Sequence, residues 1–212
     1  MIRKPLIIIS ACLFLTTLIA CEDDDNDGRK YPDLQTDLVE AFTDAAKKVS
    51  RIRLDDGTTY GLSRSISATT GDTLLRCVCS YVIDDDNTHV TPYTMGVVVS
   101  NDPIPASRLG DKESAPLKVV SSWVSDRYIN AHISYMTTGK GTHQFAFVED
   151  SMSTHADGTK TAHISLFHLR PDGDMESYTQ KIYVSLPVWL YNEKADTVCL
   201  TLEGKDIKST PR

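Results

Sequence analysis

Cysteines are the side chains of this sequence with the widest chemistry, and the chain has five of them. Cys77 and Cys79 are two residues apart in a strand-like segment, whereas Cys199 is far away along the chain. Side chains at that spacing on one strand are about 7 Å apart, too far for a disulfide. One C-x-C pair also lacks the ligand number of a zinc site. We expect Cys77 and Cys79 to be small buried side chains and Cys199 a partly covered thiol, with their redox state left open.

The six histidines show no metal-binding spacing. They are His89, His132, His143, His155, His163 and His168. A zinc protease would need a pair such as H-E-x-x-H on one helix, and the sequence has none. Hydrogen bonding at strand ends and beside turns is the expected role of these side chains. The sequence therefore predicts no metal and no cofactor.

Catalysis by a nucleophile or by an acid–base pair also has no local signature. The chain has no G-x-S-x-G elbow. The cluster Ser151, Ser153, His155 and Asp157 lies on a predicted hairpin rim, where successive side chains point to opposite faces. No spacing marks a carboxylate pair for glycoside hydrolysis, and no glycine-rich loop marks a phosphate site. We predict no catalytic residues, and a hydrolase whose site assembles from distant segments is one alternative.

Cys21 has the clearest chemical role. The chain begins with the cationic residues Arg3 and Lys4, and an uncharged apolar run follows them. A membrane-spanning helix needs about 20 apolar residues, so this shorter run is typical of a secretory signal peptide. Its end, Leu-Ile-Ala-Cys, resembles the bacterial lipobox, in which cleavage precedes an acylated cysteine. Residues 1–20 are therefore predicted to be a lipoprotein signal peptide, and Cys21 the site of lipid attachment.

An acidic stretch follows Cys21. A diacylglycerol on that sulfur, with a further chain such as palmitate on the amine, would anchor the protein in a membrane. The alternating aspartates after it imitate a calcium loop, but Leu34 occupies the position where that loop needs glutamate. Residues 21–33 are predicted to be a solvated tether. The stretch also resembles the export signal of surface lipoproteins in Gram-negative bacteria. We expect an outer-membrane anchor with the protein facing outward, and a periplasmic orientation is the alternative.

Composition and charge exclude some classes of partner. The formal charge of the chain is −7, and it becomes more negative when Arg3 and Lys4 leave with the signal peptide. Phosphate binding requires a cationic surface, so the charge argues against a nucleic-acid partner. With 212 residues, of which 41% are hydrophobic, the chain can bury one large core or two smaller ones.

The sequence after the tether has the pattern of an all-β protein. Turn signals such as Asp56-Gly57 and Asp157-Gly158 recur along it. Between the turns, several segments alternate apolar and polar residues with a period of two, which is typical of half-buried strands. The clearest of these segments are residues 76–83, 128–136, 178–186 and 197–203.

Residues 34–54 allow two interpretations. Leu38, Phe42 and Val49 are among apolar residues at near-helical spacing. The alternating run that begins at Val49 and the Asp-Gly turn after it favour a hairpin instead. We predict the hairpin.

Residues 101–116 have the composition of a linker. They contain three prolines, one glycine and few apolar side chains. The linker divides the mature chain into two parts, each of a size typical for a small β domain. We place these domains at residues 34–113 and 114–208.

Several segments together resemble the NigD-like lipoproteins. Besides the lipobox and the acidic tether, they are residues 76–81 (Arg-Cys-Val-Cys-Ser-Tyr), 123–130 (Trp-Val-Ser-Asp-Arg-Tyr-Ile-Asn), 143–148 and 166–174. The resemblance covers most of the chain, and the stretch 123–130 is its most specific part. It implies an N-terminal OB-like barrel followed by a C-terminal antiparallel β-sandwich, which agrees with the strand pattern. The family's name implies a role in immunity to a bacteriocin. Cys77 and Cys79 are a departure from the family pattern.

These observations lead us to expect a protein that binds and does not catalyse. The first expected role is self-protection against a bacteriocin-like peptide or protein. The alternative is a glycan-binding accessory lipoprotein of a surface nutrient-uptake system, so the ligand is an unknown protein or glycan. Trp189, Tyr191 and Tyr128 are predicted to be exposed strand-end aromatics that contact the partner. Trp123 is predicted to pack internally.

Overall fold

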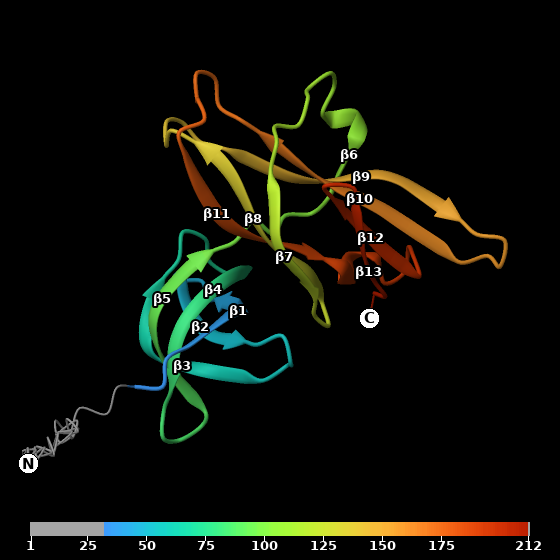
Figure 1. Ribbon diagram of the computed structural model, residues 1–212. Coiled ribbons are helices and arrows are strands. Elements are labelled where there is room, and N and C mark those ends of the chain that lie inside the picture. The colour runs from blue at the N-terminus through green and yellow to red at the C-terminus, as the bar shows by residue number, and fades with distance from the viewer. Residues whose placement is uncertain (1–31, 212) are drawn as a thin grey trace, which may run out of the picture. The chain divides into compact units, whose positions relative to one another are not determined.

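The computed structural model describes residues 32–211. The signal peptide, Cys21 and the acidic residues that follow it lie outside the described residues, so their roles stay predictions. From Asp33 onward the chain forms one unit, and strands make up nearly all of its regular structure (Figure 1).

The first five strands close into a barrel in the order β1-β2-β3-β5-β4. They are β1 (Gln35–Thr43), β2 (Lys48–Arg53), β3 (Thr59–Ser67), β4 (Leu74–Ile83) and β5 (His89–Val97). Every neighbouring pair is antiparallel except β3 and β5, which pair in parallel through Gly61 and Leu62 and so close the barrel. This five-stranded barrel confirms the expected OB-like architecture.

Strands β1 and β2 form the hairpin predicted for residues 34–54. Val39 and Ala41 belong to the barrel core, whereas Leu38 and Glu40 are buried on the opposite face of β1. Because both faces of β1 are covered, its apolar residues do not alternate cleanly with polar ones. This explains why the segment has near-helical spacing although it is a strand.

The barrel interior is a closed apolar cluster. Its buried members are Val39, Ala41, Val49, Ile52, Cys77, Cys79, Tyr81 and Val90. Cys77 and Cys79 are free thiols, and burial raises the pKa of both to about 11. Cys199 is also free and is fully buried, not partly covered, because it lies on an inner strand between His163 and Lys208.

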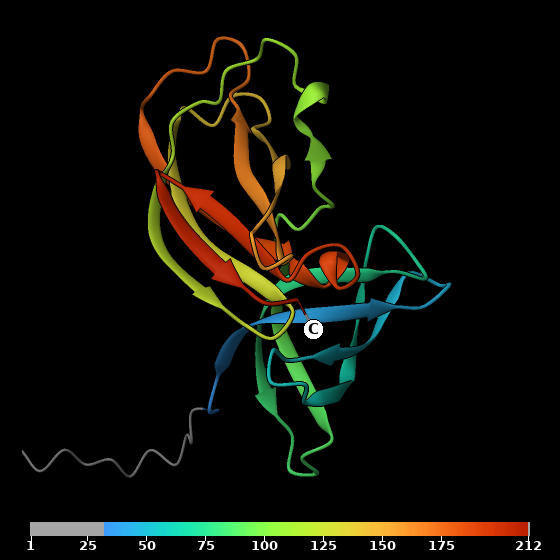
Figure 2. The same cartoon turned by 90° about the vertical axis from the view of Figure 1, so that its right-hand side faces the viewer.

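The remaining strands form the two layers of a β-sandwich (Figure 2). One layer has the order β11-β8-β7 and consists of β7 (Lys118–Val124), β8 (Tyr128–Thr137) and β11 (Tyr178–Pro187). The other has the order β13-β12-β10-β9-β6 and consists of β6 (Ile104–Pro105), β9 (Gln144–Thr154), β10 (Lys160–Leu169), β12 (Thr197–Leu202) and β13 (Lys205–Ser209). Two short 3-10 helices, η1 (Ala106–Arg108) and η2 (Val188–Tyr191), complete it. No helix in residues 32–211 has the length and apolar character needed to cross a membrane.

An apolar core fills the space between the two layers. Strand β8 contributes Ile129, Ala131 and Ile133 to it, and β12 contributes Val198 and Leu200. These are side chains that the period-two pattern places on one face, so the predicted strands and their faces are confirmed. The sandwich is not purely antiparallel, because β10 pairs in parallel with β12 and β6 pairs in parallel with β9.

The segment after β5 joins the sandwich at once. Val99 forms a parallel bridge with Val184 of β11. Further along, the hydroxyl of Ser114 accepts a hydrogen bond from the backbone N–H of His168 at 3.0 Å. The proline-rich segment is therefore attached to the sandwich at both of its ends, and the boundary between the two predicted domains stays a prediction.

The three buried thiols should resist alkylation in the native protein. With iodoacetamide at about pH 8, Cys77, Cys79 and Cys199 should stay unmodified, because they are buried and a thiol of raised pKa is almost fully protonated there. In guanidinium chloride all three should react. Mass spectrometry of tryptic peptides measures both states. Rapid labelling of Cys77 or Cys79 in native protein would contradict the packing of the barrel.

Candidate functional site

Residues 123–130, the most specific stretch of the sequence, lie where the barrel meets the sandwich. They cover the end of β7, a tight turn and the start of β8. A hydrogen bond of 2.9 Å from Ser125 N to the carbonyl of Tyr128 closes the turn. Trp123 and Asn130 are partners across the two strands. This turn carries side chains of the sandwich to the outer surface of the barrel.

Glu40 of β1 is the centre of a first polar group at this junction. Its side chain points away from the barrel core, yet the residue is only 2% exposed. From the sandwich, Arg127 Nε and the Tyr128 hydroxyl donate to Oε1 at 3.0 and 2.8 Å. From the barrel, Arg53 Nε donates to Oε2 at 2.6 Å. Burial, and then the Glu40 charge, raise the pKa of Tyr128 to about 12, so this phenol remains a hydrogen-bond donor.

Arg76 of β4 is the centre of a second polar group. The residue is 4% exposed, and its guanidinium forms a bidentate ion pair with Asp55 at 2.6 and 2.8 Å. Across the junction it donates to Asn130 Oδ1 at 3.2 Å and to Ser185 Oγ at 3.4 Å. Its Cζ atom also lies 4.1 Å from the ring centroid of Tyr128. The guanidinium is thus held by the barrel and by the sandwich together.

These two groups explain why the barrel and the sandwich belong to one unit. Removing a charge from water costs on the order of several kcal/mol unless it is paired and hydrogen-bonded. The sandwich covers Glu40 and Arg76, and it also supplies part of their hydrogen bonds through Arg127, Tyr128 and Asn130. The buried charges are therefore satisfied only when the two parts sit in this arrangement.

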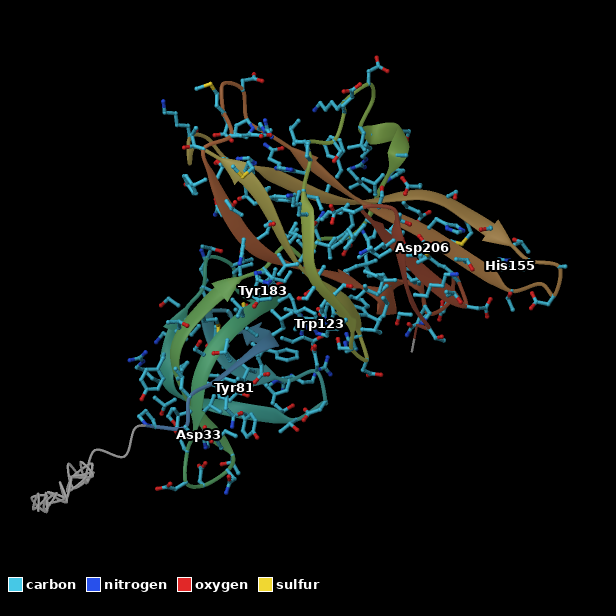
Figure 3. All side chains as sticks on the ribbon, in the orientation of Figure 1. Asp33, Tyr81, Trp123, His155, Tyr183 and Asp206 are labelled. Carbon is cyan, nitrogen blue, oxygen red and sulfur yellow. The ribbon has the colours of Figure 1, made fainter. Side chains whose placement is uncertain are left out.

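A cleft of about 490 Å³ lies beside the polar groups. The barrel lines it with apolar side chains and three carboxylates, and the sandwich lines it with aromatic rings. The main lining residues are Leu38, Val78, Asp37, Asp55, Asp56, Trp123 and Tyr183. None of its lining residues is a lysine, an arginine or a histidine. Figure 3 labels Trp123 and Tyr183 at this place.

The aromatic side chains are not placed as the sequence predicts. Trp123 is 37% exposed instead of packed internally. Its ring lies edge to face against that of Tyr183, with the ring centroids 6.3 Å apart. Tyr128 and Tyr191 are only 3% and 2% exposed, because their hydroxyls donate to carboxylates of the protein itself. Trp189 is half-buried. Of the four aromatic residues considered in the sequence, Trp123 is the one that is open to a partner, and Tyr128 and Tyr191 are not.

A second cluster brings together His143, His168 and Asp174, which the sequence does not connect. His143 Nδ1 lies 2.7 Å from His168 Nε2, and His143 Nε2 lies 3.0 Å from Asp174 Oδ2. The His168 ring is fully buried and stacks on Phe145 with ring centroids 4.5 Å apart. A hydrogen bond from the Thr138 hydroxyl is the main cause that lowers the pKa of Asp174 to about 2.

Hydrogen bonds and burial together keep the basic nitrogens of this cluster away from a substrate. Burial, and then the neighbouring His143, lower the pKa of His168, so its imidazole is neutral near pH 7. If both rings are neutral, the arrangement that suits Asp174 has His143 Nε2–H donating to Asp174 and His168 Nε2–H donating to His143 Nδ1. This arrangement leaves His168 Nδ1 buried and without a hydrogen-bond partner among the described residues. Both nitrogens of His143 are therefore occupied, and His168 has no exposed surface. The cluster holds loops on the sandwich and is not arranged for acid–base chemistry.

The serine–histidine cluster of the sequence does not assemble into a triad. Ser153 Oγ lies 2.5 Å from His163 Nε2, whereas His155 Nε2 contacts Thr161 Oγ1 at 2.8 Å. Asp157 accepts hydrogen bonds within its own turn. In the part of the chain that the structure describes, no group of three or more His, Cys, Asp or Glu side chains could hold a metal ion.

The described residues define a two-part β protein, an OB-like barrel followed by a β-sandwich, and in this chain buried charges join the two parts. A family model for the NigD-like C-terminal beta sandwich domain matches residues 101–211, just over half of the chain. The chain therefore belongs to the NigD-like family. A search of curated proteins found no significant match.

Several solved structures share this fold. A NigD-like immunity protein from Bacteroides caccae ATCC 43185 has a TM-score of 0.64 at 22% identity, over 84% of this chain and 93% of that one. A candidate toxin-related protein from Parabacteroides distasonis ATCC 8503 has a TM-score of 0.61 at 13% identity, over 84% of this chain and 91% of that one. A candidate lipoprotein from Bacteroides fragilis NCTC 9343 has a TM-score of 0.55 at 12% identity, over 83% of this chain and 95% of that one. Because each alignment covers at least 83% of this chain, the barrel and the sandwich occur together in these proteins too.

Replacing Glu40 by Gln should destabilise the protein by about 2–3 kcal/mol, because Arg53 and Arg127 lose their shared charge partner. Each arginine side chain is about one third exposed and keeps part of its hydration, which limits the loss. Urea denaturation of the wild type and of Glu40→Gln measures the difference. The exposed Glu193→Gln is the matched control and should change stability little. A Glu40→Gln variant as stable as the control would contradict the role given to this carboxylate.

Folding stability should fall as the pH drops below about 6.5, the ordinary pKa of histidine. The unfolded chain binds a proton at His168 near that pH, whereas the folded protein resists it because burial lowers the pKa. The contribution of His168 to the free energy of unfolding is therefore fully present above about pH 6.5. It is lost as the pH falls toward the lowered pKa of the folded protein, with a slope of up to about 1.4 kcal/mol per pH unit. The Asp174 contribution is lost only at lower pH, as the pH falls below about 4 toward its folded pKa of about 2.

Urea denaturation between about pH 7.5 and pH 5 measures this slope. His168→Gln keeps a hydrogen-bond donor for His143 but cannot titrate, so it should flatten the slope. His155→Gln, at an exposed position, is the control and should change the slope less than His168→Gln does. If His168→Gln has the slope of the wild type, another group carries the pH dependence.

Proposed function

We propose that this chain is an exported, lipid-anchored binding protein that protects its cell by binding a bacteriocin-like peptide or protein, without catalysis. One observation carries the proposal. Residues 123–130, the stretch most specific to the family, build the junction and place the exposed Trp123 in the cleft beside it. A specific stretch that builds a rigid junction and an open cleft supports binding more than bond-making chemistry.

Support for the immunity role comes from the relatives. One solved structure of the same fold is described as a NigD-like immunity protein, and another as a candidate toxin-related protein. These descriptions concern those proteins. Because this chain belongs to the NigD-like family, we extend the immunity role to it as a proposal.

The lipid anchor at Cys21 is part of the same proposal. It rests on the lipobox of the sequence, and a candidate lipoprotein among the matched structures supports it. We place the anchor in the outer membrane, with the acidic tether presenting the folded part at the cell surface. A protein in this position would meet an incoming toxin before the toxin reaches the cell.

A glycan-binding accessory of a nutrient-uptake system is the second candidate function. The exposed ring of Trp123 beside carboxylates favours it, because sugars stack on aromatic rings and hydrogen-bond to carboxylates. Growth on polysaccharides, compared with survival of a toxin, separates the two functions. The hydrolase alternative gains no support from the histidine cluster, because both nitrogens of His143 are engaged within the protein and His168 is fully buried.

A killing assay in the bacterium that carries the gene tests the proposal. Deletion of the gene should sensitise the cells to bacteriocin-containing culture supernatants of related strains, and the wild-type gene should restore survival. Cys21→Ala should fail to restore survival, lose incorporation of radiolabelled palmitate and leave the outer-membrane fraction. Cys12→Ala, within the predicted signal peptide, is the matched control and should behave as the wild type.

Two results would contradict the proposal. Equal survival of the deletion strain and its parent in every supernatant would contradict the immunity role. Retention of palmitate by Cys21→Ala would contradict the assigned lipid attachment.

A further inference from the structure

We propose that the cleft between barrel and sandwich binds a basic peptide segment that presents an arginine or lysine side chain next to an apolar one. This inference rests on the proposed function, because it names the chemistry of the partner that the protein intercepts. Three features of the cleft support it: its exposed aromatic ring, its charge and its hydrogen-bonding atoms.

The aromatic ring makes the cleft suited to a peptide. Trp123 is one of nine large apolar side chains that are left exposed in the described chain, at 37%, and it is the tryptophan among them. It lies with the apolar side chains of Leu38, Leu54 and Val78 in a cleft of about 490 Å³. A partly exposed tryptophan in a concave site is typical of the residues that dominate protein–peptide binding.

The charge of the cleft selects a cation. Asp37 and Asp56 are exposed, and no lysine, arginine or histidine lines the cleft. The third carboxylate, that of Asp55, is neutralised by the buried guanidinium of Arg76. Asp37 belongs to the face of β1 that points to the barrel core and accepts a hydrogen bond of 2.8 Å from the Tyr81 hydroxyl, so Asp56 is the carboxylate most open to the cleft. The negative charge of the two aspartates attracts a positively charged group and repels an acidic one.

The hydrogen-bonding atoms favour a cation over a neutral sugar. Carboxylate oxygens only accept hydrogen bonds, and a guanidinium or ammonium group only donates them. A sugar also needs donors from the protein, and the hydroxyls of Thr36 and Ser125 in this cleft are already engaged, with Ser80 and Tyr128. A sugar would therefore depend on the Tyr183 hydroxyl and the Trp123 indole N–H for its donors. The ring of Trp123 adds an attraction for cations that sugars lack.

The walls of the cleft are fixed before any ligand binds. Trp123 comes from the sandwich and Asp56 from the β2–β3 turn of the barrel. Their separation is set by the buried contacts of Glu40 and Arg76 with the sandwich. A prearranged site loses little conformational entropy on binding.

Fluorescence anisotropy with the full-length lipoprotein in non-ionic detergent tests the inference. The probe is a fluorescein-labelled synthetic peptide of alternating arginine and leucine. We expect saturable binding that weakens with added salt. The same peptide with citrulline in place of arginine keeps the shape but lacks the charge, and it should bind at least about tenfold more weakly.

Substitutions locate the binding site. Trp123→Ala and Asp56→Asn should each weaken binding of the arginine peptide at least about tenfold. Asp157→Asn is the matched control for Asp56→Asn, because both aspartates precede a glycine of positive φ and accept the N–H of the threonine two residues later. Tyr93→Ala removes another exposed aromatic ring, outside the cleft. Both controls should bind within about twofold of the wild type.

The exposed position of Asp56 keeps the test valid if Trp123→Ala is poorly folded. Wild-type affinity in both cleft variants would overturn the inference. It would also be overturned if maltoheptaose, a neutral oligosaccharide, bound the protein through Trp123 while the arginine peptide did not. That result would favour the glycan function.

The killing assay separates the inference from the proposed function. If the cleft binds the arginine peptide but the deletion strain is not sensitised, the cleft inference stands and the immunity role fails. If the deletion strain is sensitised and both cleft variants restore full survival, the immunity role stands and the cleft is not the site of the partner.

Discussion

The structure depends on two opposite charges that are neighbours on the barrel and are buried by the sandwich. Glu40 and Arg76 are register partners across β1 and β4, yet each has its own set of further partners. Neither charge is compensated by its neighbour alone, so the loss of either set would leave a buried ion without partners. This constraint fixes the position of the sandwich on the barrel, and the cleft follows from that position.

The period-two alternation of apolar and polar residues predicts which face of a strand is covered, but it does not predict which part of the protein covers that face. The faces of β8 and β12 follow from alternation alone, because their apolar side chains meet in one core. Glu40 and Arg76 look like ordinary outward-facing charges. The groups that bury them, such as Asn130, are 54 or more residues away along the chain. The junction is therefore a tertiary property that the local pattern does not carry.

The misplaced aromatic residues have a related cause. A buried tyrosine needs a partner for its hydroxyl, and Tyr128 finds Glu40 in the barrel. A signal for Trp123 was present in the sequence, because Asn130 falls on the polar face of its strand. Directly opposed residues of an antiparallel pair share a face, so Trp123 lies on the same outer side as Asn130. The pairing of β7 with β8 was needed to use that signal.

The cleft takes its aromatic ring from the sandwich and its aspartates from the barrel, and this has a consequence for relatives of this chain. Trp123 lies within the sandwich region that defines the family, whereas Asp37 and Asp56 lie in the barrel, outside that region. Neither aspartate is a partner of Glu40 or Arg76. A change at Asp56 would alter the charge of the cleft without disturbing the junction, whereas Asp37 also accepts a hydrogen bond from the buried Tyr81. One architecture can thus carry clefts of different charge, each selecting a different partner, while the buried contacts that fix the walls stay the same.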